Sequence, residues 1–317
     1  MSNTKYTYAV ARIRALETKL FNQAVIDQLI GCATEEECIQ FLEEKGWGDQ
    51  ETSGNGEAIL NREEEKTWET IQEMGVDMSV FDVLSYPNLF HNLKAAIKEA
   101  CTPEGSRPTN IYYEDTSIPP QEMLEIIQNK EFSRLPQIMA EPAKEAYEAL
   151  LHTRDGQLCD VIIDRAALDA IYQAGQKASD KIIKDYAESV VAVADIRIAV
   201  RSQKTGKTVE FMKRAMAECE SLNVDQLARA AAGGIEAVTE YLSQTAYAQG
   251  GQAIAESPSA FERWCDNRLM QDMQPQKYEV FSVGPLVAYV LARQNEIKTV
   301  RIILSGKQNG FSDDSIR

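Results

Sequence analysis

The stretch Phe281–Arg317, FSVGPLVAYVLARQNEIKTVRIILSGKQNGFSDDSIR, contains a pattern that recurs along the chain. Near its centre the cation Arg301 stands within an apolar run, and Gly310 follows nine residues later. The same arrangement occurs earlier, where Arg197 stands in an apolar run nine residues before Gly206. Self-similarity at a fixed spacing indicates repeated structural units.

A third copy surrounds Lys94, and a weaker fourth copy surrounds Arg14 near the start of the sequence. Lys94 precedes Arg197 by 103 residues, and Arg197 precedes Arg301 by 104 residues. Snorkelling to solvent explains one cation in an apolar helix, but it does not explain so regular a return. A period of about 100 residues is far longer than the 20–50 residues of solenoid repeats, and it suits a small helical domain.

The spacing therefore predicts three copies of one helical module in which Lys94, Arg197 and Arg301 occupy equivalent positions. The predicted modules comprise residues 1–105, 106–206 and 207–317, with helices shared between neighbours. The weak copy at Arg14 also predicts that the last helix packs beside the first.

The composition excludes several classes of protein. The chain has 317 residues and is 44% hydrophobic, which is enough for substantial cores. It carries 33 basic and 49 acidic residues, a net charge of −16. Such a charge repels phosphate backbones and anionic lipid surfaces, so we expect no nucleic-acid partner and no electrostatic membrane adsorption. A basic protein partner fits this charge.

The cysteines and histidines form no recognisable metal or disulfide pattern. Two histidines, His91 and His152, and no CxxC pair are present, so no zinc site can be assembled. We expect reduced thiols in a cytosolic protein. The six cysteines are Cys32, Cys38, Cys101, Cys159, Cys219 and Cys265.

No apolar run is long enough to cross a bilayer. The longest strongly apolar window, Val283–Ala292, is much shorter than the ~20 residues that a membrane-spanning helix needs. The start of the sequence also lacks the apolar core of a signal peptide.

Helical periodicity and helix-ending residues dominate the chain, and no alternating pattern with hairpin turns appears, so we predict an all-α fold. The first helix is predicted from Lys5 to Ile30. Thr34 and Glu37 form a capping box at the start of the next helix. The run Glu63–Glu65 is interpreted as a solvated helix face. A long tract from Asp160 to Gln203 is predicted to be one helix, or two that meet near Gly175.

No residues support catalysis. The segment Lys204–Thr208 contains Gly-Lys-Thr, but the glycine that a phosphate-binding loop needs five positions earlier is replaced by Arg201. An apolar helix precedes it instead of a strand, so a turn between helices is expected. A serine or cysteine nucleophile needs a nearby histidine, and neither His91 nor His152 stands in a recognisable constellation of such residues. We therefore assign no catalytic, metal-binding or cofactor-binding residue.

Several motifs together resemble one family. They are Tyr8–Arg14, Phe90–Lys94, Gly284–Tyr289, and Glu296–Leu304 followed by Gly310. This pattern resembles the C subunits of bacterial and archaeal V/A-type ATPases, whose eukaryotic counterpart is the d subunit of the vacuolar ATPase. The resemblance extends from end to end, and its C-terminal motif is the most specific part. In the family the helix after the last glycine continues, whereas this sequence stops at Ile316-Arg317.

The resemblance implies a funnel-shaped, non-catalytic protein of three similar helical domains around a pseudo-threefold axis. Such proteins lie at the cytoplasmic face of the rotating membrane ring, as peripheral proteins without a transmembrane segment. They receive the foot of the central shaft, which the D and F subunits form, and transmit torque between ATP hydrolysis or synthesis and proton or sodium translocation. The resemblance also implies a member of a mixed complex, not a homo-oligomer.

Two other classes of function remain open at this point. A stand-alone helical scaffold that binds a soluble partner would show the same composition and repeats. A helical enzyme would require a convergent polar pocket, which the sequence does not display.

Overall fold

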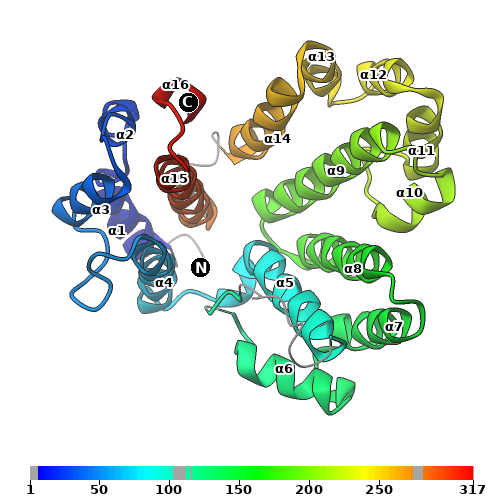
Figure 1. The fold of residues 1–317 in the computed structure, drawn as a ribbon, viewed down its shortest axis with the longest axis horizontal. Coiled ribbons are helices and arrows are strands. Elements are labelled where there is room, and N and C mark those ends of the chain that lie inside the picture. The colour runs from blue at the N-terminus through cyan, green and yellow to red at the C-terminus, as the bar shows by residue number, and fades with distance from the viewer. Residues whose placement is uncertain (1–5, 103–111, 115, 274–280, 317) are drawn as a thin grey trace. The chain divides into compact units, whose positions relative to one another are not determined.

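Every regular element that the structure describes is a helix. The computed structural model describes residues 6–102, 112–114, 116–273 and 281–316, and the prediction of an all-helical chain is confirmed within them (Figure 1). The chain divides into two compact units, each described by itself below. Unit 1 comprises Met1–Met78 and Met273–Arg317, and unit 2 comprises Ser79–Asp272.

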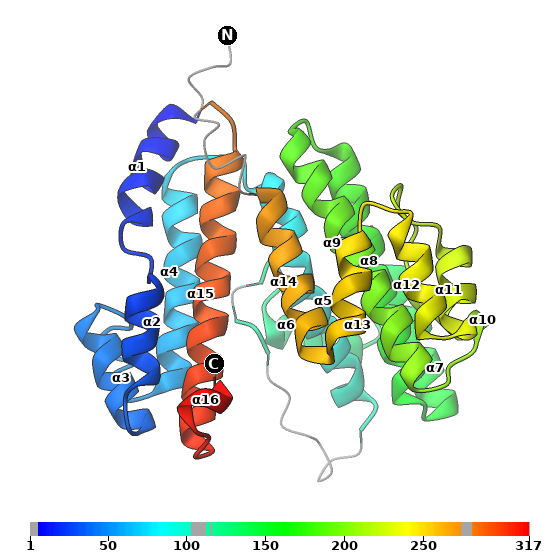
Figure 2. The ribbon, with the colours of Figure 1, turned by 90° about the horizontal axis from the view of Figure 1, so that it is seen from above.

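Unit 1 brings the two ends of the chain together. Its helices are α1 (Thr7–Glu17), α2 (Gln23–Ile30), α3 (Glu35–Glu44), α4 (Gly56–Glu73), α15 (Gly284–Gln308) and α16 (Asp313–Ile316). The long helix α15 packs against α4, α3 and α1, and α4 and α15 lie side by side in both views (Figures 1 and 2). The contact between α15 and α1 confirms the prediction that the last long helix packs beside the first.

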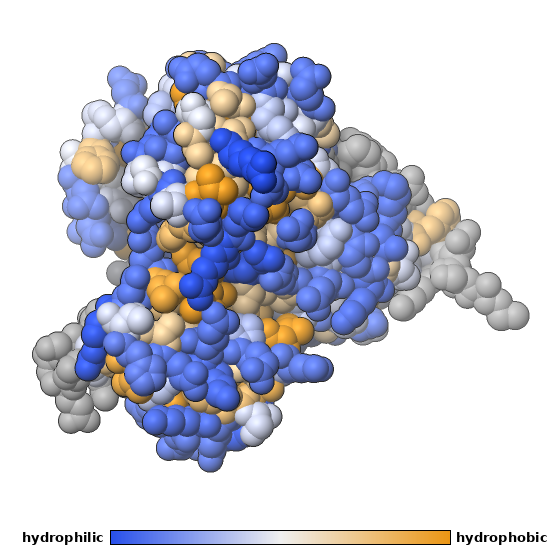
Figure 3. Space-filling model, turned by 90° about the vertical axis from the view of Figure 1, so that its right-hand side faces the viewer, coloured by the Kyte–Doolittle hydropathy of each residue, from blue (hydrophilic) through white to orange (hydrophobic). Residues whose placement is uncertain are grey.

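Unit 2 contains ten α-helices among its described residues, and the 3₁₀ helices Met78–Phe81 and Phe132–Arg134 precede α5 and α7. The α-helices are α5 (Asp82–Ala100), α6 (Pro120–Gln128), α7 (Gln137–Thr153), α8 (Gly156–Lys177), α9 (Lys181–Lys204), α10 (Val209–Ala215), α11 (Val224–Gly233), α12 (Ile235–Ser243), α13 (Ala248–Glu256) and α14 (Pro258–Met273). On the side where α7, α10 and α11 lie in Figure 1, most side chains are hydrophilic, and hydrophobic ones form smaller patches between them (Figure 3).

Three hydrophobic clusters of the described residues each include one repeat helix. In unit 1, α15 contributes to a cluster with α2, α3 and α4. In unit 2, α5 shares a cluster with α6, α7 and α8, and α9 shares another with α10, α11, α12 and α14. The apolar faces of the repeat helices are therefore core faces, and their cations lie at the edges of these cores.

The first predicted helix is wrong in one respect, because α1 and α2 are separate helices. The side chain of Asn22 accepts a hydrogen bond from the backbone N–H of Val25 at 3.1 Å and caps α2. Just before it, the backbone N–H of Phe21 donates to the carboxylate of Glu296 on α15. A distant acceptor therefore satisfies a backbone group that a continuous helix would have used internally.

The predicted capping of α3 is confirmed. The hydroxyl of Thr34 accepts from the backbone N–H of Glu37 at 3.3 Å. In return the carboxylate of Glu37 accepts from the backbone N–H of Ala33 at 2.8 Å. Two backbone amides at this helix start are thus satisfied.

The predicted long tract consists of two helices, α8 and α9, which pack against each other. The helices are separated at residues 178–180, after Gly175 and not at it. Gly175 marks their close approach instead: a Cβ atom added there would lie 2.3 Å from the Cβ of Ala187. Glycine is therefore required at this position by packing.

Candidate functional site

The three repeat cations have similar surroundings. Each lies on a long helix and forms an ion pair with a carboxylate on a neighbouring helix of the same unit. The pairs are Lys94 with Asp164 at 2.7 Å, Arg197 with Glu262 at 3.0 Å, and Arg301 with Glu57 at 3.1 Å. The cationic side chains are 22%, 30% and 38% exposed in the same order, which fits the snorkelling of a long stem from an apolar face.

Two of these cations line one groove of unit 2. The groove has a volume of about 350 Å³ and lies between α5, α8 and α9. Lys94, Arg197 and Arg201 contribute its positive charge, and apolar side chains such as Phe90 and Ile198 contribute to its walls. The structure therefore brings together the cations of two repeats in a recess that is lined by both apolar and charged side chains.

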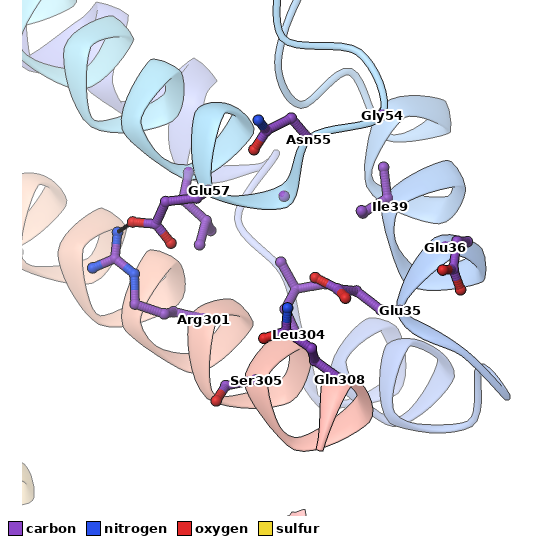
Figure 4. A pocket seen from close by; sticks show the side chains of 12 residues that line it. Glu35, Glu36, Ile39, Gly54, Asn55, Glu57, Arg301, Leu304, Ser305 and Gln308 are labelled. Atoms are coloured by element: carbon purple, nitrogen blue, oxygen red, sulfur yellow. Dashed lines mark hydrogen bonds and ion pairs between the residues drawn. The ribbon is translucent and has the colours of Figure 1, made fainter. Parts of the chain in front are cut away.

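The third cation, Arg301, lines a pocket of unit 1 with a volume of about 510 Å³. Figure 4 shows Arg301 on α15 reaching the carboxylate of Glu57 on α4, and the side chains of Glu35 and Glu36 on α3 at the other side. Three carboxylates and one guanidinium give this pocket an acidic character. It can accept a basic side chain from a partner.

A buried charged network lies between α4 and α15 in unit 1. The guanidinium of Arg293 forms ion pairs with the carboxylates of Glu63, at 2.5 Å, and Glu296. All three residues are buried, and the guanidinium also lies over the ring of Trp47, 5.1 Å from its centroid. Burial raises the pKa of Glu296, against the opposing effects of the Phe21 N–H group and Arg293.

This network corrects the interpretation of Glu63–Glu65 as a solvated face. Glu63 is 5% exposed and is shared between Arg293 and Lys66, whose Nζ atom lies 2.7 Å from it. The sequence contained one signal that was missed: Arg293 and Glu296 stand three residues apart inside the apolar helix of the repeat motif. Charges at this spacing lie on the same helix face.

Unit 2 contains a buried acidic residue that forms no ion pair with any described cation. Asp195 is fully buried, and one of its carboxyl oxygens accepts from the backbone N–H of Ala217 at 3.0 Å. Its other oxygen has no partner among the described residues. Burial holds the pKa of Asp195 well above its usual range, so the group is protonated where an exposed aspartate is ionised.

The other residues considered from the sequence do not converge. His91 lines the unit 2 groove and meets Tyr113 edge to face at 5.1 Å, whereas His152 is exposed in the last turn of α7. Burial raises the pKa of the Cys38 and Cys159 thiols to about 12, which opposes formation of reactive thiolates. No cluster of described residues has the composition of a metal site.

The segment Lys204–Thr208 is a turn between helices, as predicted. Gly206 has a φ of +64°, which favours glycine. The hydroxyl of Thr208 caps α10 by accepting from the backbone N–H of Phe211 at 3.2 Å. Within the described parts of the chain, no helix is both long and apolar enough to cross a membrane.

Comparison with known proteins identifies the family. Residues 9–317 match the family described as ATP synthase (C/AC39) subunit. This chain belongs to that family. The matched residues therefore include parts of both units and all three repeat cations.

Two relatives match this chain over most of its length, and a third matches about half of it. The chain is 21% identical over 312 residues to the C subunit of the V-type sodium ATPase of Enterococcus hirae, covering 96% of this chain and 94% of the relative. It is 22% identical over 351 residues to the C subunit of the A-type ATP synthase of Methanocaldococcus jannaschii, and this alignment covers 98% of this chain and 85% of the relative. A third relative, the C subunit of the A-type ATP synthase of Halorubrum lacusprofundi, is 26% identical over 189 residues, or 56% of this chain and 53% of its own.

Proposed function

We propose that this member of the C/AC39 family is a non-catalytic part of the central stalk of a V/A-type ATPase. In this role it binds the foot of the shaft, formed by the D and F subunits, on one side and the membrane rotor ring on the other. It transmits torque between ATP hydrolysis or synthesis and the translocation of protons or sodium ions. It is then a peripheral protein at the cytoplasmic face of the membrane, and it is attached there through the ring.

The family match over residues 9–317 is the observation that carries this proposal. Two relatives, named as the C subunits of a V-type and an A-type enzyme, align over most of their length. The described helices include none that could span a bilayer, which is compatible with attachment through other proteins of the complex.

The acidic pocket around Arg301 supports a basic partner segment. It lies in a chain with a net charge of −16, and three of its lining residues are glutamates. Complementary charge mainly raises the association rate and orients the partner. Because exposed charges are screened beyond roughly 8 Å at physiological ionic strength, affinity for the shaft is expected to fall as salt rises.

The three-module arrangement is part of the proposal. The three hydrophobic clusters, each with one repeat helix, support it. So do the equivalent ion pairs of Lys94, Arg197 and Arg301. Superposition of the three repeat helices with their neighbours by rotations near a third of a turn is the corresponding expectation, and an experimental structure of the assembled rotor would test it.

A binding experiment with purified components tests the function. The full chain is mixed with the shaft proteins and with the detergent-solubilised rotor ring, separately and together. The expected result is one complex that contains all of them, with weaker shaft binding at high salt. A chain that binds neither component would contradict the proposal and favour a scaffold with another partner.

A charge reversal locates the contact. Glu36→Lys in the acidic pocket is expected to weaken shaft binding, because it replaces an attraction with a repulsion. Glu210→Lys is the matched control, since Glu210 is also exposed in the first turn of a helix but lies outside the pocket. Equal binding by both variants would exclude this pocket as the shaft contact.

A further inference from the structure

A separate pocket of unit 1 lies at the linker between α1 and α2. It has a volume of about 630 Å³, and its walls come from this linker, the turn after α3, α4 and α15. We call it the linker pocket. Its charged side chains are Lys19, Lys45, Glu63, Lys66 and Arg293, so cations outnumber carboxylates in the lining of a strongly acidic protein.

The inner charges of the linker pocket neutralise one another. Arg293 pairs with Glu63 and Glu296, and Lys66 pairs with Glu63 at 2.7 Å. Lys66 also donates to the backbone carbonyl of Gly48 at 2.6 Å. Two cations therefore face two carboxylates, and this inner wall adds no net charge.

Three other polar groups of the linker pocket have no acceptor among the described residues for the hydrogen bonds that they can donate. The side chain of Lys19 is exposed, and its ammonium group has no ion-pair or hydrogen-bond partner among the described residues, since the one bond of this residue is from its backbone N–H to the carbonyl of Leu16. The ammonium of Lys45 lies over the ring of Phe41, 5.2 Å from its centroid, and has no carboxylate partner in the described chain. Asn22 uses its amide oxygen to cap α2, which leaves its N–H₂ group as a donor. Three donors without acceptors thus line one pocket.

Contacts of Phe21 with other parts of unit 1 hold the linker between α1 and α2 in place. The backbone N–H of Phe21 donates to Glu296, and the ring of Phe21 stacks on Trp47 with centroids 5.0 Å apart. Lys19 and Asn22 on either side of Phe21 are therefore presented from a fixed segment. A fixed arrangement of donors reduces the entropy lost when a ligand binds.

We propose that the linker pocket binds a small phosphorylated molecule. Its volume is within the range of about 300–1,000 Å³ that is usual for small-ligand sites. The free cations are lysines, which bind phosphate as point charges. The guanidinium of Arg293, whose planar fork suits carboxylates and phosphates alike, is already occupied by Glu63 and Glu296, so the lysines are the cations left for a ligand.

The hydroxyl groups of the pocket indicate what else the ligand carries. Thr18 donates to the carbonyl of Ala15, and Thr70 donates to the carbonyl of Lys66, both at 2.7 Å. Each hydroxyl then offers only lone pairs to a ligand, so it accepts from a hydroxyl or amino group. A nucleotide or a sugar phosphate combines such donors with phosphate.

Calorimetric titration of the purified full chain with ADP tests this proposal, with adenosine and pyrophosphate as further probes. ADP is expected to bind, and adenosine, which lacks phosphate, is expected to bind at least about tenfold more weakly, because charge-assisted contacts are lost. Failure of both ADP and pyrophosphate to bind at millimolar concentration would overturn the proposal. Equal affinity for ADP and adenosine would overturn it as well.

Substitution of the two free lysines locates the site. The double variant Lys19→Gln, Lys45→Gln is expected to weaken ADP binding by about tenfold or more. The changed side chains are exposed, so the fold is expected to be retained. Lys144→Gln in α7, an exposed lysine outside the pocket, is the matched control. ADP affinity that is unchanged in the double variant would place binding elsewhere and contradict the assignment.

Discussion

The two units join their long helices by different means. In unit 1, buried charges lie between α4 and α15, where Arg293 faces Glu63 and Glu296. In unit 2, α8 and α9 meet at Gly175 and Ala187, where no side chain larger than a methyl group intervenes. The carboxyl group that unit 2 buries, Asp195, has no cation paired with it.

The difference predicts opposite sensitivities. A buried ion pair recovers the cost of desolvation only while both partners are present, so removing one charge is expensive. A close contact of small residues involves no such cost, but it leaves no room for added atoms. Unit 1 should therefore be sensitive to loss of a charge, and unit 2 to a gain of volume.

The largest effect is expected for Arg293→Met. The change leaves Glu63 and Glu296 buried without their shared cation, and the expected loss of stability is about 3–5 kcal/mol. Hydrogen exchange is the measurement, since a chain of two units need not unfold in one step. Protection should fall in α4 and α15 and remain in α8. A loss below about 1 kcal/mol would mean that the network contributes no more than a surface pair.

A smaller effect is expected for Gly175→Ala in unit 2. The added Cβ would lie 2.3 Å from that of Ala187, so α8 and α9 must move apart, at a cost of about 1–3 kcal/mol. Urea unfolding followed by circular dichroism measures it. Gly156→Ala is the control, because a Cβ at Gly156 meets no atom within 4 Å. Equal stability of the two variants would show that the α8–α9 contact tolerates volume.

The buried carboxyl of Asp195 predicts a dependence on pH. Below about pH 4, the ordinary pKa of aspartate, the folded and unfolded chains both hold the proton. As the pH rises further, the unfolded chain releases it while folded Asp195 keeps it until its raised pKa is passed, so stability declines across this window. Asp195→Asn has no such proton to lose, and it should gain stability relative to the parent as the pH rises.

Unfolding of the parent and of Asp195→Asn from about pH 4 to about pH 8 measures this difference. The difference in unfolding free energy should grow steadily with pH. A constant difference would mean that Asp195 titrates alike in the folded and unfolded chains, and that its burial has no electrostatic consequence.

The smallest effect is expected for the repeat cations. Arg301 lies on the same helix as Arg293, but it is 38% exposed and its partner Glu57 is 58% exposed. Arg301→Met should change stability by about 0–1 kcal/mol, because solvent screens such pairs. Hydrogen exchange in α15 compares it directly with Arg293→Met. Similar losses in both variants would remove the distinction between buried and exposed charges in unit 1.

The sequence predicted features whose causes are local. The cap at Thr34 depends on Glu37 three residues later, and the turn at Gly206 on a positive φ. The repeat of Arg197 and Arg301 correctly indicated long helices with apolar core faces. The signals for the cap and for the turn lie within one or two helical turns of the residues that they position.

Features that depend on distant partners could not be predicted in the same way. Helices α1 and α2 are separate, and in the segment between them the backbone N–H of Phe21 donates to the carboxylate of Glu296, which lies 275 residues away in the sequence. Glu63 is buried because Arg293 lies beside it, although 230 residues separate them in the sequence. The linker pocket follows from both contacts, so its existence was not visible in any local pattern.

Reconstitution of the rotary complex tests the central claim most directly. Ion transport into vesicles and ATP hydrolysis are measured together, with and without this chain, using the membrane ring, shaft and catalytic head of the same enzyme. We predict that ATP hydrolysis drives ion transport only when the chain is present, and that the head without it hydrolyses ATP with no transport. Equal transport per ATP in its absence would contradict the role proposed for this protein as the link between shaft and ring.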